Sequence, residues 1–314
     1  AAKTPWHFGT MNILLLAPHP FYQERGTPIA VDLLGHTLAD RGDTVDILTY
    51  HEGEERSYDR NVNVHRITPR FKINNIRPGF SLKKLACDAH MTPQAVAMAK
   101  NNNYDVVHAV EESAFMAMCI LRRFKTPYIF DMDSSMPAQM AASHSILRPM
   151  LPLLRRMERT AIQNAIAVVP MCETLAEEAA KAGARYVRVL RDIPLTERPG
   201  ARNETADDLP RGSVNFLYMG NLEPYQGVDL MLRSFSILTR EHPEARLIVV
   251  GGNARHIDQY STMAHELAIE NQTHFVGPRP TRMMKSLFDQ SDILLSPRVT
   301  GTNTPMKIYS YMAS

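Results

Sequence analysis

Cysteine is scarce in this chain of 314 residues, which contains three, Cys87, Cys119 and Cys172. They lie far apart and show no paired spacing, so the sequence offers neither a disulfide framework nor the Cys-x-x-Cys pairs of a zinc site. This usage is typical of a protein kept in a reducing compartment, and we expect a cytoplasmic location.

Long apolar runs and an excess of charge of one sign are also missing. No segment approaches the roughly 20 apolar residues needed to cross a bilayer. The formal net charge of +2 is too small to predict nucleic-acid binding. The 12 histidines lack metal-ligand spacing, so His19, His108 and His144 are expected to pack or cap, and we predict no metal site. We expect a protein that is soluble or lies peripherally against the inner membrane face.

Both ends of the chain have an artificial character. Residues 1–10 precede Met11, which leads directly into a strand, and they are left out of the fold prediction. Residues 305–314 resemble a helix without a capping residue or stop signal. We therefore expect the second domain to be incomplete.

What the chain does contain is an alternation of strands and helices, which predicts an α/β fold with doubly wound parallel sheets. Residues 196–212 are polar, with prolines, glycines and charges of both signs, and are interpreted as a linker. They separate an N-terminal Rossmann-like domain (11–195) from a C-terminal one (213–314). The predicted strands are 12–17, 44–49, 62–67, 104–110, 127–132, 165–169, 214–219, 246–251, 274–276 and 293–296. The predicted helices are 29–38, 82–100, 113–123, 138–164 with two proline interruptions, 173–182, 228–240, 259–270, 281–290 and 305–314.

The most informative segment is 214–238, an apolar strand followed by a polar loop and an amphipathic helix. The strand ends at Gly220, and Gly227 closes the loop. Such a loop directs backbone N–H groups and the positive end of a helix dipole at a bound ligand, an arrangement that suits phosphate. A similar strand, loop and helix opens the chain at 11–38, so we expect two domains that face a shared cleft.

Ligands of open α/β sheets bind beyond the carboxyl ends of the strands. In the first domain that loop contains Gly26, just ahead of the helix, which is either a simple turn residue or a point of close approach to a ligand. The three-glycine dinucleotide fingerprint is missing, which argues against a nicotinamide dehydrogenase. In the second domain Thr304 and Pro305 are suited to begin a helix, and Lys307 follows in its first turn. Lys307 and Arg298 are either phosphate ligands or solvated surface cations.

Several segments in order resemble the family-4 retaining glycosyltransferases of GT-B fold, from Met11 onward. They are LADRGDTVDILT, YDVVHAVEES, PYIFDMDSS, RTAIQNAIAVV, LYMGNLEPYQGVDL, LIVVGG, HFVGPRP, SDILLSP and TPMKIYSYMAS. The resemblance implies sugar transfer from a nucleoside-diphosphate donor to a carbohydrate or lipid-linked acceptor, with retained configuration and neither metal nor other cofactor. It places the donor mainly on the second domain and the acceptor on the first. Stabilisation of the departing diphosphate would supply much of the catalysis.

The chain departs from the family pattern at charged positions. The family's arginine and lysine in the loop after the first strand of the second domain align with Asn221 and Gln226. Its paired glutamates align with Thr302 and Ser310, and a first-domain histidine aligns with Asp133. The donor would then depend on Lys307, Arg298 and helix N-termini. We assign the donor site to Gly26, Gly220, Asn221, Gln226, Arg298, Thr302, Asn303, Thr304, Lys307 and Ser310, the catalytic role to Asp133, and the acceptor side to His19 and Glu111.

Asp131 and Asp133 form an Asp-x-Asp pair, which holds a divalent cation in the other large glycosyltransferase fold. Because this chain begins a second βα unit after Gly212, Asp133 is more simply placed in the cleft or used as a strand-end cap.

Basic residues gather in two places. The first group is Arg66, Arg70, Lys72, Arg77, Lys83 and Lys84. The second is Arg148, Arg155, Arg156 and Arg159, flanked by Leu147, Leu151, Leu153 and Leu154. Each is either a solvated face or a contact with an anionic membrane.

Two other functions stay open. A nucleotide-sugar 2-epimerase would need acid/base carboxylates, for which Glu111, Glu112 and Asp133 are the candidates. A non-catalytic sugar-nucleotide binder would need none.

Overall fold

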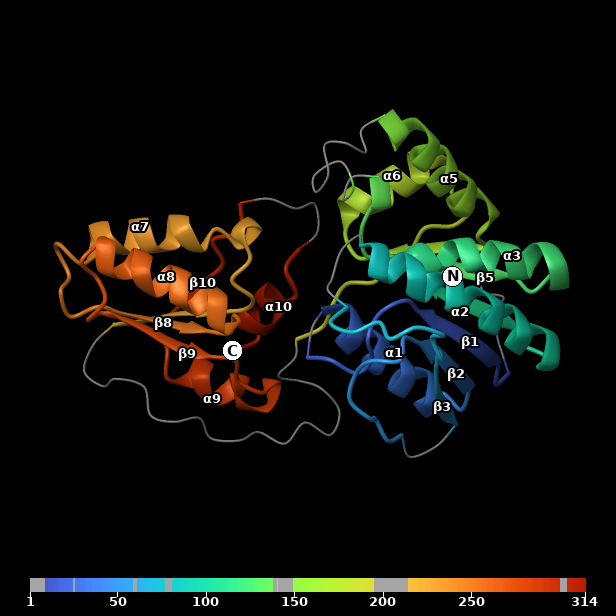
Figure 1. The fold of residues 1–314 in the computed structure, drawn as a ribbon, viewed down its shortest axis with the longest axis horizontal. Coiled ribbons are helices and arrows are strands. Elements are labelled where there is room, and N and C mark those ends of the chain that lie inside the picture. Colours follow the sequence, from blue (N-terminus) through green and yellow to red (C-terminus); the bar gives the residue numbers. More distant parts are fainter. Residues whose placement is uncertain are drawn as a thin grey trace, which may run out of the picture. The chain divides into compact units, whose positions relative to one another are not determined.

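The computed structural model describes residues 9–24, 26–58, 61–76, 81–137, 140, 149–194, 214–299 and 304–314. The chain divides into two compact units, Ala1–Arg191 and Asp192–Ser314, each built on one parallel sheet (Figure 1). This confirms the predicted α/β class with two parallel sheets. The expected linker, 196–212, lies outside the described residues.

Unit 1 contains six parallel strands in the order β3-β2-β1-β4-β5-β6. Their bounds are β1 Asn12–Ala17, β2 Thr44–Thr49, β3 Val62–Arg66, β4 Val106–Val110, β5 Tyr128–Met132 and β6 Ala167–Pro170. The helices are α1 Gly26–Asp40, α2 Leu82–Asn101, α3 Ala114–Phe124, α5 Leu151–Asn164 and α6 Glu173–Ala182, with a 3₁₀ turn η1 at Glu111–Ser113.

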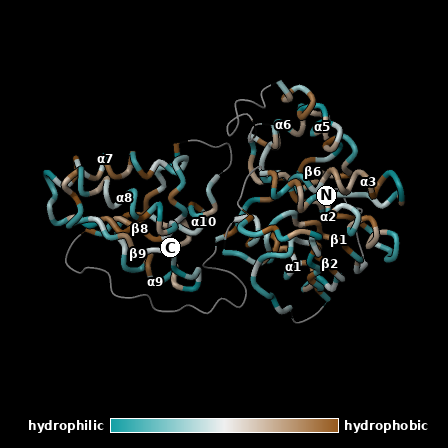
Figure 2. The backbone as a smooth tube through the Cα atoms, in the orientation of Figure 1, coloured by the Kyte–Doolittle hydropathy of each residue, from teal (hydrophilic) through white to brown (hydrophobic). Residues whose placement is uncertain are grey.

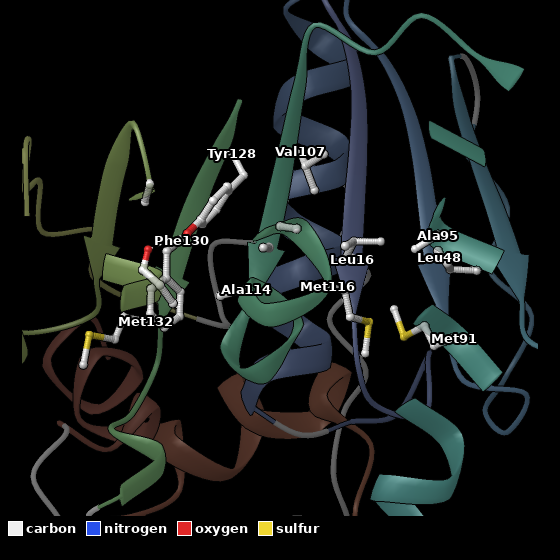
Figure 3. Packing of buried hydrophobic residues seen from close by; sticks show 14 of the residues in the cluster. Leu16, Leu48, Met91, Ala95, Val107, Ala114, Met116, Tyr128, Phe130 and Met132 are labelled. Carbon is white, nitrogen blue, oxygen red and sulfur yellow. Dashed lines mark hydrogen bonds between the residues drawn. The ribbon is translucent and has the colours of Figure 1, made fainter. Parts of the chain in front are cut away.

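The two faces of this sheet are covered by different helices. Side chains alternate along a strand, so Leu14 and Leu16 point to the face opposite that of Leu15. Leu14, Leu16 and Leu48 belong to a buried cluster to which α2 contributes Met91 and Ala95, and α3 contributes Ala114 and Met116 (Figure 3). On the other face α1 lies close to β2, where a Cβ on Gly35 would touch Ile47 at 3.4 Å. Burial of both faces explains why these strands are apolar runs.

The edge strand β6 is covered by the segment that leaves unit 1. The β6 residue Val168 donates its N–H to the carbonyl of Tyr186 at 2.9 Å and accepts from Arg188 at 3.1 Å. Leu190 donates to Pro170 at 2.9 Å, one step further along. The hydrogen-bonding groups of the β6 edge are therefore partnered by backbone.

Unit 2 has four parallel strands in the order β10-β7-β8-β9. Their bounds are β7 Asn215–Met219, β8 Arg246–Val250, β9 Thr273–Gly277 and β10 Ile293–Leu295. The helices are α7 Val228–Leu238, α8 Ala254–Glu266, α9 Met284–Asp289 and α10 Met306–Met312, with 3₁₀ turns η4 at Pro224–Gln226 and η5 at Thr281–Met283.

The core of unit 2 lies between its sheet and the helices α7 and α8. Val228, Met231, Leu232 and Phe235 of α7 are buried at the spacing of one helical face, as the sequence pattern predicts. Central strands such as β1 and β8 are largely brown in Figure 2, in keeping with their burial. Among the described residues no helix combines the length and apolar character needed to span a bilayer.

Several predicted boundaries are wrong. The first helix begins at Gly26 rather than after it, because the loop is shorter than the sequence suggested. The helix predicted at 259–270 spans Ala254–Glu266, since Asn253 accepts a hydrogen bond from the N–H of His256 and caps it. Of the region predicted at 138–164, residues 138–139 and 141–148 lie outside the described residues, and its last part is the helix that begins at Leu151, with a proline in its first turn.

Candidate functional site

In unit 2, two chain segments meet where the strands β7 and β10 end. The loop 220–227 follows β7 and the segment 296–299 follows β10, its hydrogen-bonded neighbour. Gly227 has a φ of +71°, and a Cβ there would lie 2.3 Å from the carbonyl oxygen of Pro297. Only glycine combines that backbone conformation with such close approach. Gly227 therefore allows the two segments to pack directly against each other.

Lys307 of α10 reaches into this edge from the far end of the chain. Its Nζ lies 3.4 Å from Oε1 of Gln226 and 3.9 Å from the centre of the Tyr218 ring. A Cβ on Gly220 would meet the same Nζ at 2.9 Å, so the ammonium lies directly over that glycine. Lys307 therefore places a cation beside Gln226. Gln226 is the position that aligns with a lysine in the family that the sequence resembles.

The ammonium of Lys307 is half-buried, and the carboxylates of the described residues lie away from it. No Asp or Glu oxygen of the described residues forms an ion pair with it within 4.0 Å. Burial, with a smaller contribution from the charge of Arg298, lowers the pKa of Lys307 to about 7. A buried charge without a counter-charge is costly, and an anion bound at this edge would remove the cost.

Polar groups of the 220–227 loop surround this cation. The Tyr218 hydroxyl donates to the carbonyl of Asn221 at 2.6 Å, and Asn221 donates through Nδ2 to the Tyr225 hydroxyl at 3.0 Å. The guanidinium of Arg298 lies 5.5 Å from the centre of the Tyr225 ring. Asn221, Gln226, Arg298 and Lys307 thus belong to one neighbourhood.

The remaining donor-side predictions are less informative. Ser310 is fully buried in α10 and Thr304 is half-buried just before that helix. Thr302 and Asn303 lie outside the described residues. Nothing in the structure tests a role for these four positions.

In unit 1 the corresponding edge carries acidic groups. Glu111 follows β4 with a φ of +49°, a left-handed conformation that is uncommon for a residue other than glycine. Its carboxyl is hydrogen-bonded to the Ser134 side chain, and burial raises its pKa to about 7. A residue held in this conformation at the end of a strand is a candidate for function.

Lys84 of α2 pairs with the acidic residues at this edge. Its Nζ lies 2.5 Å from Oε1 of Glu112 and 3.9 Å from Oε2 of Glu111. One turn further along α2, Asp88 accepts a hydrogen bond from the Tyr50 hydroxyl at 2.6 Å. Burial, followed by the charge of Glu112, raises the pKa of Asp88 to about 7.

Sequence reasoning missed this network of Tyr50, Lys84, Asp88, Glu111 and Glu112. It named Glu111 and Glu112 but left Lys84 in a basic surface cluster and gave Tyr50 and Asp88 no role. The available signal was the spacing of Lys84 and Asp88, four residues apart on the predicted helix and so on one face.

The two aspartates of the Asp-x-Asp pair lie in different environments. Asp131 of β5 lies 2.9 Å from Nε2 of His108 on β4, so His108 pairs with a carboxylate. Asp133 is half-buried just beyond β5. The described residues contain no group of three His, Cys, Asp or Glu side chains arranged to hold a metal ion.

His19 and Gly26 flank the segment after β1. His19 is buried, its Nδ1 lies 3.1 Å from the carbonyl of Pro20, and its own carbonyl accepts from the Thr49 hydroxyl at 2.6 Å. Gly26 is exposed as the first residue of α1, and a Cβ there would meet nothing within 4 Å. Gly26 therefore makes no close approach to other described residues.

Curated relatives match only part of the chain. The D-inositol 3-phosphate glycosyltransferases of Corynebacterium aurimucosum and Corynebacterium glutamicum are 28% and 27% identical over 110 residues. These matches cover 33% of this chain and 26% of each relative. The chain thus aligns with about a quarter of the length of these relatives.

Solved structures match nearly the whole chain. Sucrose-phosphate synthase from Thermosynechococcus elongatus superposes with a TM-score of 0.72 at 16% identity, covering 92% of this chain and 75% of that one. The Anabaena protein HepE in complex with UDP-glucose gives 0.62 at 15% identity, covering 90% and 73%. At this identity the likeness concerns the fold.

Two family descriptions match in succession. "Glycosyl transferase 4-like domain" matches residues 25–191 and "Glycosyl transferases group 1" matches residues 203–314. The first alone spans more than half of the chain. The chain therefore belongs to the glycosyl transferase 4-like family and has the fold of the GT-B glycosyltransferases.

Proposed function

We propose that this protein transfers a sugar from a nucleoside-diphosphate donor to a hydroxyl group of an acceptor, with retention of configuration and without a metal ion. The observation that carries the proposal is the half-buried ammonium of Lys307, which has no carboxylate partner among the described residues and lies over Gly220 beside Gln226. A diphosphate is the ligand that compensates such a cation. The solved relative HepE holds UDP-glucose, which supports a UDP-sugar as the first donor to test.

Lys307 would act on the leaving group. As the sugar departs, negative charge grows on the diphosphate, and a preorganised cation in a buried site stabilises that charge more than water does. Removing one such donor typically costs about 100- to 1,000-fold in kcat. Arg298 and the backbone N–H groups of the 220–227 loop would supply further stabilisation.

Unit 1 would hold the acceptor. Glu111 offers a carboxyl with a raised pKa, which can donate a hydrogen bond to a hydroxyl when protonated and accept one when ionised. We assign the acceptor contacts to Glu111 and His19, with Asp133 nearest the reacting sugar. The acceptor class we propose is a carbohydrate or a lipid-linked carbohydrate, met at the cytoplasmic face of a membrane.

The 2-epimerase alternative keeps one supporting observation, the raised pKa of Glu111, which suits acid/base catalysis. Product analysis separates the two reactions. The transferase yields a glycosylated acceptor and free nucleoside diphosphate in equal amounts, whereas the epimerase consumes no acceptor and yields a sugar inverted at C2, still joined to the diphosphate or released from it by water.

The direct test of the donor site is binding of UDP and UDP-glucose by calorimetry and thermal shift. Lys307→Met should weaken UDP binding about 10- to 100-fold, the range expected for loss of one charge-assisted hydrogen bond. Lys285→Met is the matched control, because Lys285 is an exposed lysine that pairs with Asp289 in the same unit. Equal affinity of the Lys307 variant and wild type would remove Lys307 as the anchor.

Turnover then distinguishes an enzyme from a binding protein. Wild type should release UDP from UDP-glucose faster in the presence of a suitable acceptor, and Lys307→Met should lose that release. Tight UDP-glucose binding without UDP release across a broad set of sugar acceptors would favour the non-catalytic binder.

A further inference from the structure

The helices α3 and α5 form one exposed surface that is both cationic and apolar. A groove of about 330 Å³ runs between them, lined by Met118 and Arg122 of α3 and by Leu153, Arg156, Met157 and Thr160 of α5. The sequence indicated the arginines and leucines of 147–159 as a solvated face or a membrane contact, but no residue of α3, so the joint surface is visible only in the folded chain.

The charge of this surface is of one sign. Arg122, Arg123 and Lys125 are exposed at the end of α3, and Arg155, Arg156 and Arg159 are exposed on α5. The α3 sequence contains no acidic residue, and the single carboxylate of α5, Glu158, turns inward to Ser135 and the N–H of Met136. No described carboxylate forms an ion pair with any of the six cations.

Large apolar side chains are exposed among these cations. Met150 is 47% exposed, Leu153 55% and Met157 40%, whereas Leu154, Ala161 and Ile162 on the opposite face of α5 are buried. A helix with one face in the core and with arginines and apolar side chains on the other suits the boundary between lipid headgroups and acyl chains. There arginines pair with phosphates while leucine and methionine enter the apolar layer.

Three residues of the other basic cluster, Arg66, Lys83 and Lys84, make internal contacts instead. Arg66 donates to the carbonyls of Glu52 and Glu54 at 3.1 and 2.8 Å, and Lys84 is buried against Glu112. Lys83 donates to the carbonyl of Asn74 at 2.5 Å. The structure therefore separates two clusters that the sequence treated alike.

We propose that the α3–α5 surface docks on a bilayer that contains anionic phospholipids. Arg122 and Arg156 flank the groove and contact lipid phosphates, while Leu153, Met157 and Met150 insert at the level of the upper acyl chains. This docking is independent of the donor site in unit 2 and goes beyond the proposed sugar transfer.

The test is flotation of the full chain with vesicles of phosphatidylcholine alone and with vesicles that contain added phosphatidylglycerol. Wild type should float with the anionic vesicles, lose most binding at high salt and bind neutral vesicles far more weakly. Arg122→Gln/Arg156→Gln should reduce binding to anionic vesicles about tenfold or more, because each surface arginine contributes to lipid attraction. Leu153→Ser should reduce it several-fold at unchanged salt dependence.

Matched controls locate the contact. Arg233→Gln/Arg240→Gln removes two exposed arginines, one on the unit 2 helix α7 and one just beyond its end, and should leave binding unchanged although α7 also exposes Leu230 and Ile237. Phe71→Ser/Leu82→Ser removes the most exposed apolar side chains beside the first basic cluster and should also leave it unchanged. All substituted residues are exposed, so the variants should keep the wild-type melting temperature.

Three results overturn the proposal. They are no flotation of wild type with anionic vesicles, equal flotation with neutral vesicles, and loss of binding in a control variant but not in the α3–α5 variants. UDP binding is measured on the same preparations. Vesicle binding without UDP binding would then count against the donor site alone, and UDP binding without vesicle binding would count against the docking surface alone.

Discussion

A lysine lies at the carboxyl edge of each of the two sheets. The lysine of unit 1 has carboxylate partners, whereas that of unit 2 has none among the described residues. In unit 1, Lys84 lies between Glu111 and Glu112, with Asp88 one turn away, so its charge is more than balanced. In unit 2, Lys307 lies against Gln226, Gly220 and an aromatic ring, and burial lowers its pKa. A compensated lysine stabilises its own unit, whereas an uncompensated one is suited to an external anion. The comparison sets a structural cation, Lys84, against the proposed binding cation, Lys307.

The same substitution at both lysines should have opposite effects on stability. Lys84→Met leaves the half-buried Glu112 without its partner and should cost about 3–5 kcal/mol of unfolding free energy. Lys307→Met replaces a half-buried charge, which has no carboxylate partner among the described residues, with an apolar side chain of similar shape and should leave the free energy unchanged or raise it. Urea denaturation gives the size of each effect, and hydrogen exchange assigns it to a unit. Losses of equal size in both variants would break the comparison.

Lys307 should also make unit 2 more stable at alkaline pH. Its pKa in the folded state is about 7, below the unfolded value near 10.4. Between these values the unfolded state binds more protons, so the unfolding free energy rises with pH, by on the order of 4 kcal/mol in total. The cost of the buried charge is fully present below pH 7. Denaturation of unit 2 across this range should show the rise in wild type and in Lys285→Met but not in Lys307→Met.

Unit 1 should respond to pH with the opposite slope, over a more acidic range. The pKa of Glu111 is raised to about 7 in the folded state, so between about pH 4 and 7 the folded state binds more protons than the unfolded one. The unfolding free energy should therefore fall as pH rises through this range, by on the order of 3 kcal/mol. Glu111→Gln should flatten the curve, and Asp88→Asn should do so in part. A Glu111→Gln curve identical to that of wild type would show that this carboxyl titrates normally.

The two glycine loops offer the smallest contrast. Gly220→Ala places a Cβ 2.9 Å from Nζ of Lys307 at a positive φ, and should cost about 1 kcal/mol of stability as well as weakening UDP binding. Gly26→Ala places a Cβ in open space at a helix start and should be neutral or slightly stabilising. Melting temperatures of the pair provide the check. A larger loss at Gly26 would point to contacts outside the described residues.

Much of the fold is predictable from the sequence because its signals are local. Buried parallel strands such as Asn12–Ala17 are continuous apolar runs, and the face of α7 follows from the spacing of Val228, Met231, Leu232 and Phe235. Ends of elements depend on single side chains and are less secure. Because Asn253 caps α8, that helix begins earlier than the sequence pattern predicts. The start of α1 at Gly26 has no local signal in the sequence.

The candidate site is likewise predictable only where the signal is local in the sequence. Lys307, Gly220 and Gln226 could be named from motif and resemblance, but the contact of Lys307 with Gln226 joins residues 81 positions apart and needs the folded chain. The same holds for Lys84. The sequence indicates only that it lies on a surface helix, and its partners Glu111 and Glu112 follow the strand β4, far from it in the sequence. The positive φ of Glu111 has no local sequence signal, because Asn, Asp and Gly are the residues that usually adopt it.

The segment 186–190 covers β6 and so decides where unit 1 ends as a folding unit. An open strand edge is a template for pairing with other chains, and here the chain itself occupies that template before it leaves the domain. A fragment cut before Tyr186 would expose β6 and tend to aggregate, whereas one cut after Arg191 would keep the edge sealed. Changes in length or sequence beyond Arg191 would therefore leave the backbone pairing of this edge intact.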